Sequence, residues 1–235
     1  MSEGTKTVIE TRGLTRVYRQ GKVEVRALDG VDLRVAAGEF TALAGPSGSG
    51  KSTLLNLIGV LDTPTAGVVI VDGHELGKMT RSEAARFRLE RVGFVFQAYN
   101  LLPVLTAYEN AEYILFLQGV HKKEREARVL PLLERVGLAD MKDRRPHELS
   151  GGQQQRVAVV RAIAARPAFV LADEPTANLD SKTSAALLEV MYELNQSAGT
   201  TFVLASHDQI VMERARRVVH LLDGRIESDE VKEAA

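Results

Sequence analysis

Apolar and polar positions follow two different periods along this chain. Short apolar runs, each closed by glycine or a polar residue, predict buried strands at "FTALA", "GVVIV", "GFVFQ", "AFVLAD", "TFVLAS" and "VVHLL". Longer segments with apolar residues three and four apart predict helices, as in "STLLNLIGVL" and "SKTSAALLEVMYELNQ". Strands that alternate with helices favour an α/β fold with a mostly parallel sheet covered on both faces.

Three helix starts carry the pattern of a capping box, in which a Ser or Thr is followed three positions later by Glu or Gln. The pairs are Thr80 with Glu83, Thr106 with Glu109, and Ser150 with Gln153. The second and third pairs lie in a stretch whose pattern is mostly helical. We therefore expect an α-helical insert subdomain at about 98–155.

The 235 residues suit a single domain with subdomains. The segments "VIETRGLTRVY" and "EVRALDGVDLRV" predict an N-terminal antiparallel β subdomain, and the loose alternation of the first places it at a sheet edge. The core is expected at about 1–97 and 156–226, followed by a tail at 227–235. No internal repeat is visible.

Charge and composition narrow the class of protein. The chain has 30 basic and 31 acidic residues, a near-balance that argues against a nucleic-acid partner. It has no cysteine, which excludes disulfides and thiolate metal sites. No window approaches the ~20 apolar residues of a membrane span, and no signal peptide is visible. We expect a cytoplasmic protein that reaches a membrane only by docking on another protein.

The segment "GPSGSGKST" fits the phosphate-loop pattern G-x-x-x-x-G-K-[ST] between a predicted strand and a predicted helix. Glycines let backbone N–H groups turn toward phosphate oxygens, Lys51 reaches the outer phosphates, and the Ser52 hydroxyl binds Mg²⁺. An ordinary Gly/Ser-rich turn is the alternative. The expected nucleotide-binding residues are Gly45, Pro46, Ser47, Gly48, Ser49, Gly50, Lys51, Ser52 and Thr53.

Two acids end the apolar strand in "FVLADEP". Functional groups of a buried parallel strand gather at its carboxyl end, so Asp173 is expected near the phosphate loop as a ligand of Mg²⁺. Glu174 is the better candidate for orienting or deprotonating the attacking water. The alternative is a strand that ends in exposed acids.

Two further polar residues also follow predicted strands. His207 in "VLASHD" is placed to contact a γ-phosphate, and Gln97 after "GFVF" is placed to orient water or sense Mg²⁺. A structural histidine and a plain polar strand end are the alternatives.

Tyr18 and the segment Ser150–Gly152 complete the candidate site. Tyr18 lies between two strand-like runs, where its ring could either stack on a base or pack against the protein. Ser150, Gly151 and Gly152 open a helix, and a helix N-terminus carries free N–H groups that suit an anion.

The motifs "GPSGSGKST", "FQ" at Gln97, "LSGGQQQR", "VLADEP" and "SHD", in this chain order, closely resemble those of the nucleotide-binding subunits of ABC transporters, and the resemblance covers about residues 8–224. The resemblance implies Walker A residues at 51–53, a Walker B aspartate at Asp173 and a catalytic glutamate at Glu174. It further implies a Q-loop at Gln97, a switch histidine at His207 and adenine stacking by Tyr18. "TANLD" matches the D-loop, in which Asn178 is given no function.

The resemblance also implies a homodimer that forms around ATP. Two copies face each other head to tail, and the phosphate loop of one and the signature segment of the other clamp one Mg-ATP. The signature residues are Ser150, Gly151, Gly152 and Gln153.

A narrower resemblance is to ATPases of the lipoprotein-release, macrolide-export and cell-division group (LolD-, MacB- and FtsE-like). It implies a motor on the inner face of the cell membrane that drives a permease subunit touching Leu101–Leu105. These apolar loop residues could instead pack within the chain. The alternative is a regulatory ATPase that switches a cell-envelope partner without transport. A soluble relative in DNA repair or translation would be expected to show coiled-coil arms or two fused ATPase halves, and this sequence shows neither.

Overall fold

The computed structural model describes residues 6–21 and 23–232. The strands are β1 (Thr7–Gln20), β2 (Val23–Ala36), β3 (Phe40–Ala44), β4 (Ala66–Val71), β5 (His74–Glu75), β6 (Val92–Phe96), β7 (Phe169–Asp173), β8 (Thr201–Ser206), β9 (Arg217–Leu222) and β10 (Arg225–Val231). The α-helices are α1 (Lys51–Ile58), α2 (Arg81–Arg91), α3 (Ala107–Leu117), α4 (Lys122–Arg135), α5 (Gly151–Ala164), α6 (Ser181–Ala198) and α7 (Gln209–Arg214). Short 3-10 helices lie at Leu76–Lys78, Ala139–Met141 and Pro146–Glu148.

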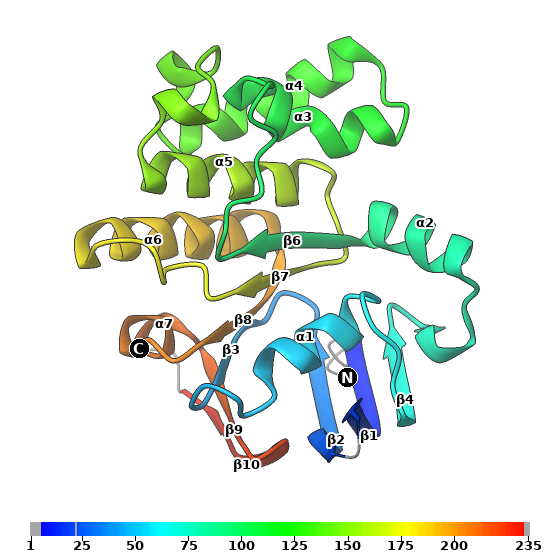
Figure 1. Ribbon diagram of the computed structural model, residues 1–235. Helices are drawn as coiled ribbons and strands as arrows, with labels where there is room; N and C mark the ends of the chain where they lie inside the picture. The colour runs from blue at the N-terminus through cyan, green and yellow to red at the C-terminus, as the bar shows by residue number, and fades with distance from the viewer. Residues whose placement is uncertain (1–5, 22, 233–235) are drawn as a thin grey trace, which may run out of the picture.

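The central sheet has the strand order β10-β9-β3-β8-β7-β6, and every pair except β10–β9 is parallel. Alternate side chains of its buried strands face opposite sides. Leu43 and Leu171 join a core with α1, whereas Ala42 and Ala172 join a core with α5, α6 and α7. Figure 1 shows α1 and α6 on opposite sides of these strands. The predicted α/β fold with a mostly parallel sheet is confirmed.

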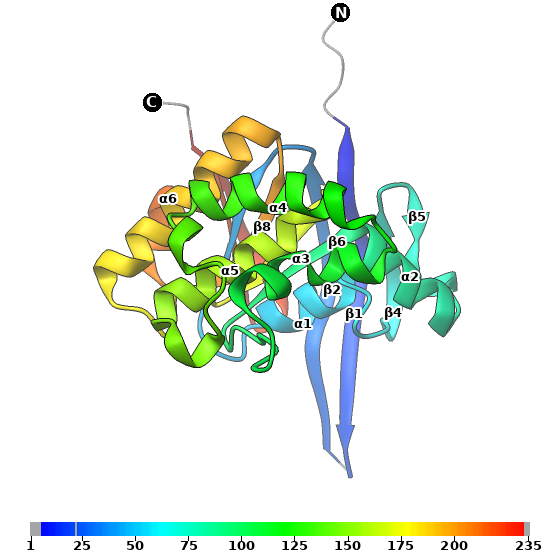
Figure 2. The same ribbon diagram turned by 90° about the horizontal axis from the view of Figure 1, so that it is seen from above.

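The second sheet is antiparallel, with the order β2-β1-β4-β5. It confirms the N-terminal β subdomain but not the edge position of the first strand, because β1 pairs with β2 on one side and β4 on the other. A register shift between Thr11 and Leu14, at the positive φ of Gly13, causes the loose alternation. Figure 2 shows the β1–β2 hairpin extending beyond the helices.

Helices α3, α4 and α5 share a third apolar core that includes Ala111, Val129 and Val160. Helix α5 also packs Val159 and Ile163 against the central sheet, so the expected boundary at residue 155 falls inside a helix that belongs to both layers. The three predicted capping boxes are present, each with both of its hydrogen bonds.

The expected tail from residue 227 is wrong, because β10 continues to Val231 and pairs with β9. Arg217 fastens the strand through Asp229 at 2.7 Å and also pairs with Glu39 at 2.9 Å. The end of that tail, 233–235, and the N-terminal residues 1–5 lie outside the described residues. Within the part of the chain that the structure describes, no helix is long and apolar enough to cross a membrane.

Candidate functional site

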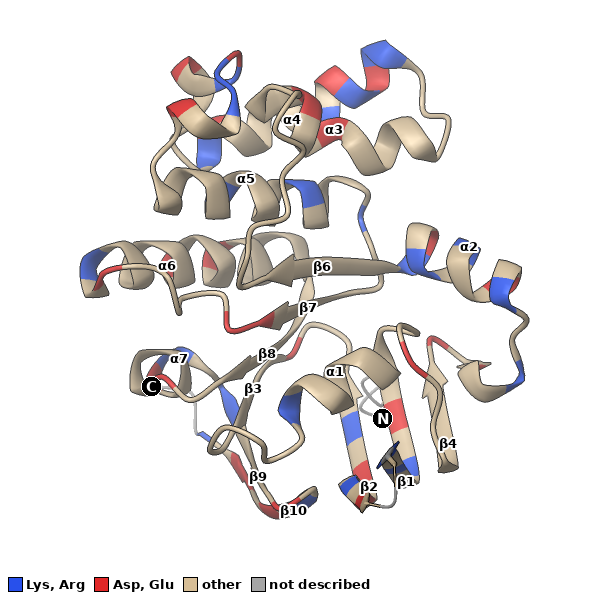
Figure 3. Cartoon of the chain, viewed as in Figure 1, with Lys and Arg blue, Asp and Glu red and all other residues tan. Residues whose placement is uncertain are grey.

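The central strands bring the phosphate loop, Gln97, Asp173, Glu174 and His207 to one edge of the sheet. Ala44 pairs with Ser206, while Asp173 pairs with Ala205 on one side and Phe96 on the other. Because these strands are parallel, the segments that follow them start from the same edge. Those segments are the phosphate loop, His207, Glu174 and Gln97. Figure 3 shows acidic chain at the end of β7 and a basic position at the start of α1.

The phosphate loop needs its glycines. Gly45 has a φ of 145°, and a Cβ there would lie 2.2 Å from the carbonyl oxygen of Leu221. Gly50 precedes α1 with a φ of 106° and gives the helix no side-chain cap. The first amides of α1 are therefore left to face an anion. Lys51 folds back over the loop and donates to the carbonyls of Gly45 at 2.7 Å and Pro46 at 3.0 Å.

Two side chains that carry oxygen atoms meet beside this loop. The Ser52 hydroxyl donates to a carboxylate oxygen of Asp173 at 3.0 Å. Burial raises the pKa of Asp173 above its ordinary value, although the Ser52 hydrogen bond opposes that shift. Among the described residues, no three His, Cys, Asp or Glu side chains gather into a metal site of their own.

Glu174 is held by two partners from the end of β8. Its carboxylate accepts from the Ser206 hydroxyl at 3.1 Å and lies 2.9 Å from Nδ1 of His207. Its amide donates to the carbonyl of Ala205 at 2.9 Å, and its φ of 45° is unusual for a residue other than glycine. The Glu174 side chain is 18% exposed and that of His207 63%, so the pair faces the surface.

The signature segment lies in another part of the molecule. Ser150 caps α5, accepting from the amide of Gln153 at 3.3 Å, while its own amide donates to the Gln153 side chain at 2.8 Å. A Cβ on Gly152 would lie 2.3 Å from the Thr183 methyl, and one on Gly151 would lie 2.7 Å from the Tyr99 hydroxyl. Figure 1 shows α5 in the upper helical layer, well apart from α1.

A sequence profile of the family described as ABC transporter matches residues 28–177, more than half of the chain. The chain belongs to the ABC transporter family. It is 41% identical to LolD of Pseudoalteromonas translucida, a lipoprotein-releasing system ATP-binding protein, over 97% of this chain and 98% of LolD. It is 47% identical to the macrolide export ATP-binding/permease protein MacB of Hyphomonas neptunium, over 96% of this chain but only 35% of MacB.

A solved structure matches the fold closely. The ATP-binding cassette MJ0796 of Methanocaldococcus jannaschii, in a dimeric post-hydrolysis state bound to ADP and Pi, has a TM-score of 0.87 at 39% identity, covering 97% of this chain and 100% of that chain. With the family, this likeness establishes the chain as an ABC-type ATPase that binds ATP, the ATP-binding subunit of a transporter.

The adenine-stacking residue of the ABC subunit remains a prediction. Tyr18 lies on β1, where its hydroxyl donates to Asp62 at 2.9 Å. The guanidinium of Arg16 lies 4.6 Å from the ring centre. Both contacts hold the half-buried ring in place, and neither of them involves a nucleotide base.

The predicted permease-contact loop divides into two parts. Leu101 packs against the helical core, whereas Leu102 is 37% and Val104 73% exposed. Asn110 of α3 fixes the loop, accepting from the Leu102 amide at 2.7 Å and donating to the Leu105 carbonyl at 3.1 Å. The sequence pattern did not reveal Asn110, because its role depends on a loop that folds back onto its helix.

Proposed function

We propose that two copies of this ABC subunit clamp ATP between the phosphate loop of one copy and the signature segment of the other. ATP hydrolysis then opens the dimer, and the motion drives a membrane permease subunit. One observation carries the proposal. The chain has two helix N-termini suited to phosphate, yet no hydrogen bond joins loop 45–50 to Ser150–Gln153 among the described residues.

A second copy supplies what one chain lacks. A head-to-tail partner would present Ser150, Gly151, Gly152 and Gln153 to the nucleotide held at Lys51. The dimeric state of MJ0796 with ADP and Pi supports this arrangement. Closure would also exclude water, which strengthens every electrostatic contact to the phosphates.

The residues at the sheet edge divide the chemistry. Glu174 polarises the attacking water, and Ser206 and His207 fix the direction of its carboxylate. Lys51 leaves its loop carbonyls and stabilises the charge that develops on the outer phosphates. Gln97 orients the water, and His207 contacts the γ-phosphate.

Mg²⁺ is the proposed cofactor. This ion takes one or two carboxylates and completes its shell with water and substrate phosphates. Ser52 and Asp173, whose oxygens lie 3.0 Å apart beside the loop, fit that donor set, with Gln97 as a third proposed ligand. Bound there, the ion would neutralise charge on the phosphate oxygens.

Glu174→Gln tests the dimer. It keeps the shape of Glu174 but removes the base, so turnover should stop while ATP stays bound. Size-exclusion chromatography with Mg-ATP should give a dimer, and without nucleotide a monomer. Adding Ser150→Arg should return the ATP-bound protein to a monomer, because a large cation blocks the partner surface. A doubly substituted protein that still dimerises would contradict the proposal.

We propose that the permease binds a cleft of about 420 Å³ between α2, β6, α3 and α5. Its lining includes Arg88, Phe94, Phe96, Leu102, Tyr113 and Arg161. The rings of Phe94 and Phe96 stack at 5.4 Å, and the described lining holds two arginines and no carboxylate. An apolar segment with an acidic residue suits this cleft.

LolD and MacB, whose names describe lipoprotein release and macrolide export, make a membrane permease the favoured partner. The subunit would thus be held at the inner face of the cell membrane.

A further inference from the structure

The five residues that carry Gln97 out of the sheet are held by their carbonyl groups. Phe96 ends β6, and residues 97–100 follow it without joining another strand or helix, so the backbone carbonyls of these residues need other donors. Four of the five carbonyls accept a hydrogen bond from a side chain. All of these donors come from α5 or from the loop after β7.

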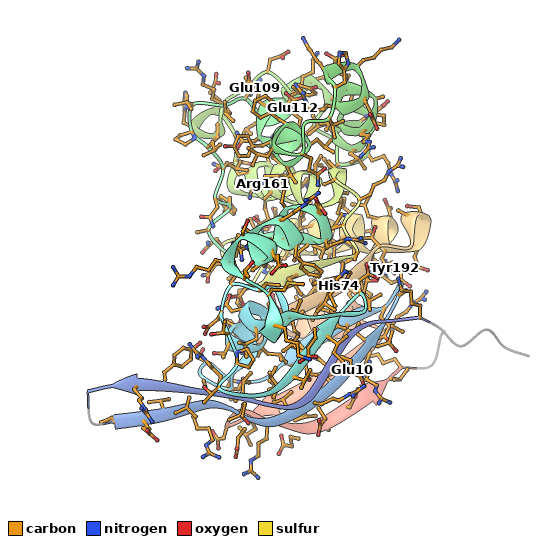
Figure 4. The ribbon with its side chains drawn as sticks, turned by 90° about the vertical axis from the view of Figure 1, so that its right-hand side faces the viewer. Glu10, His74, Glu109, Glu112, Arg161 and Tyr192 are labelled. Carbon is orange, nitrogen blue, oxygen red and sulfur yellow. The ribbon has the colours of Figure 1, made fainter. Side chains whose placement is uncertain are left out.

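Two of the donors lie on α5. Gln155, fully buried, donates through Nε2 to the carbonyl of Phe96 at 3.3 Å. Arg161 donates to the carbonyls of Tyr99 at 2.9 Å and Asn100 at 2.5 Å. Figure 4 labels Arg161 on α5.

The third donor, Asn178, lies in the loop after β7, and Gln155 also connects α5 to that loop. Asn178 donates through Nδ2 to the carbonyl of Gln97 itself at 3.0 Å. The Nε2 of Gln155 also donates to the carbonyl of Pro175 at 2.9 Å. The Gln97 loop, the signature helix and the loop 174–180 are thus tied together by one buried amide and one exposed one.

These ties have a mechanical consequence. Gln155 and Arg161 lie one to three turns from Ser150 on the same continuous helix, so they move with the signature segment as one body. A displacement of α5 would therefore pull on the carbonyls of residues 96–100. The side chain of Gln97 is exposed and would be redirected by such a pull.

We propose that Gln155, Arg161 and Asn178, here called the carbonyl clamp, are positioning residues for Gln97. They link the placement of Gln97 in one site to the placement of the signature segment that serves the other site. The inference rests on the proposed role of Gln97 in hydrolysis. If these residues had a purely structural role, the effect of removing one of them on kcat would be the same whether or not Gln97 is present.

Asn178→Ala is the main test, because Asn178 is exposed and its loss should not impair folding. We expect kcat for ATP to fall about 10- to 100-fold, the scale of a small misplacement of a catalytic group, with KM changed less than about twofold. Gln196→Ala, which removes an exposed amide on α6, should leave both constants unchanged.

A double-substitution cycle separates positioning from packing. In a Gln97→Ala background, Asn178→Ala should lower kcat by less than about twofold, because the group it positions is gone. If the two substitutions instead lower kcat by the product of their separate effects, the proposed positioning role would be wrong. If Gln97→Ala alone hydrolyses ATP at the normal rate, the proposed role of Gln97 fails first and the catalytic part of the clamp fails with it.

Gln155→Met supplies an independent arm, since it keeps the volume but removes the donor. Hydrogen exchange should rise at the amides of residues 97–100 in both Gln155→Met and Asn178→Ala, with the melting temperature as a check on folding. Unchanged exchange in Asn178→Ala, which is expected to fold normally, would show that the carbonyls are not held by these side chains.

Discussion

Asp173 and Glu174 are adjacent acids with different surroundings. Asp173 lies half-buried beside the phosphate loop with Ser52 as its partner, whereas Glu174 turns through a positive φ toward Ser206 and His207. The sequence indicated both acids because they follow a buried strand. It did not indicate Ser206, which looks like the last residue of an apolar strand, because that contact depends on the pairing of β7 with β8.

The raised pKa of Asp173 predicts a pH-dependent stability. Below the ordinary pKa of an aspartate the group is protonated in both the folded and unfolded states. As pH rises from the ordinary value to the raised one, the unfolded state loses this proton while the folded state keeps it, so the stability of the folded protein falls. Above the raised value the group is charged in both states and the loss of stability is complete.

Asp173→Asn should therefore raise the melting temperature of nucleotide-free protein at neutral pH, because the uncharged amide avoids the cost of a charge at this position. The difference should vanish in strong acid. Thermal melts across pH would show it, and a gain that persists at the lowest pH would have to come from something other than the charge.

At the scale of elements, helix starts were the most accurate predictions, since a capping box is a local interaction. The predicted edge position of β1 was wrong, because β1 also pairs with β4, a strand far along the chain that local sequence does not indicate. The glycines of the signature segment depend on both local pattern and distant contacts. Their pattern was visible, but the need for Gly152 comes from Thr183 on α6.

Gly152→Ala should lower the free energy of unfolding, because the added methyl would overlap the Thr183 methyl where α5 meets α6. Adding Thr183→Ser removes that methyl and keeps the hydroxyl that bonds Asp180, so stability should return. Urea titration measures both effects. If stability returns while ATPase activity does not, Gly152 also has a role at the nucleotide; failure to regain stability would contradict the packing argument.

At the scale of the whole molecule, the sequence predicted the layers but not the cleft between them. The cleft forms where α2, β6, α3 and α5 meet, and its arginines come from two distant helices. The apolar loop residues were visible in the sequence. Which of them face outward was not, since that depends on Asn110 and the helical core.

If the permease docks in the proposed cleft, Leu102→Asp should uncouple ATP hydrolysis from the permease, because it places a carboxylate in an apolar part of that cleft. Activity of the isolated subunit and its melting temperature should change little. Leu130→Asp is a matched control, since Leu130 is 40% exposed on α4 away from the cleft. Permease-stimulated hydrolysis in reconstituted vesicles measures the effect, and equal losses in both variants would refute docking here.

The distance between phosphate loop and signature helix within one chain has a genetic consequence. One variant would carry an inactivating substitution at Lys51 and another an inactivating substitution at Ser150, and each would be inactive by itself. If two copies clamp ATP as proposed, mixing the two variants gives mixed dimers in which the intact phosphate loop of one copy meets the intact signature helix of the other. Such pairs should recover one working site, so two dead alleles expressed in the same cell would complement each other.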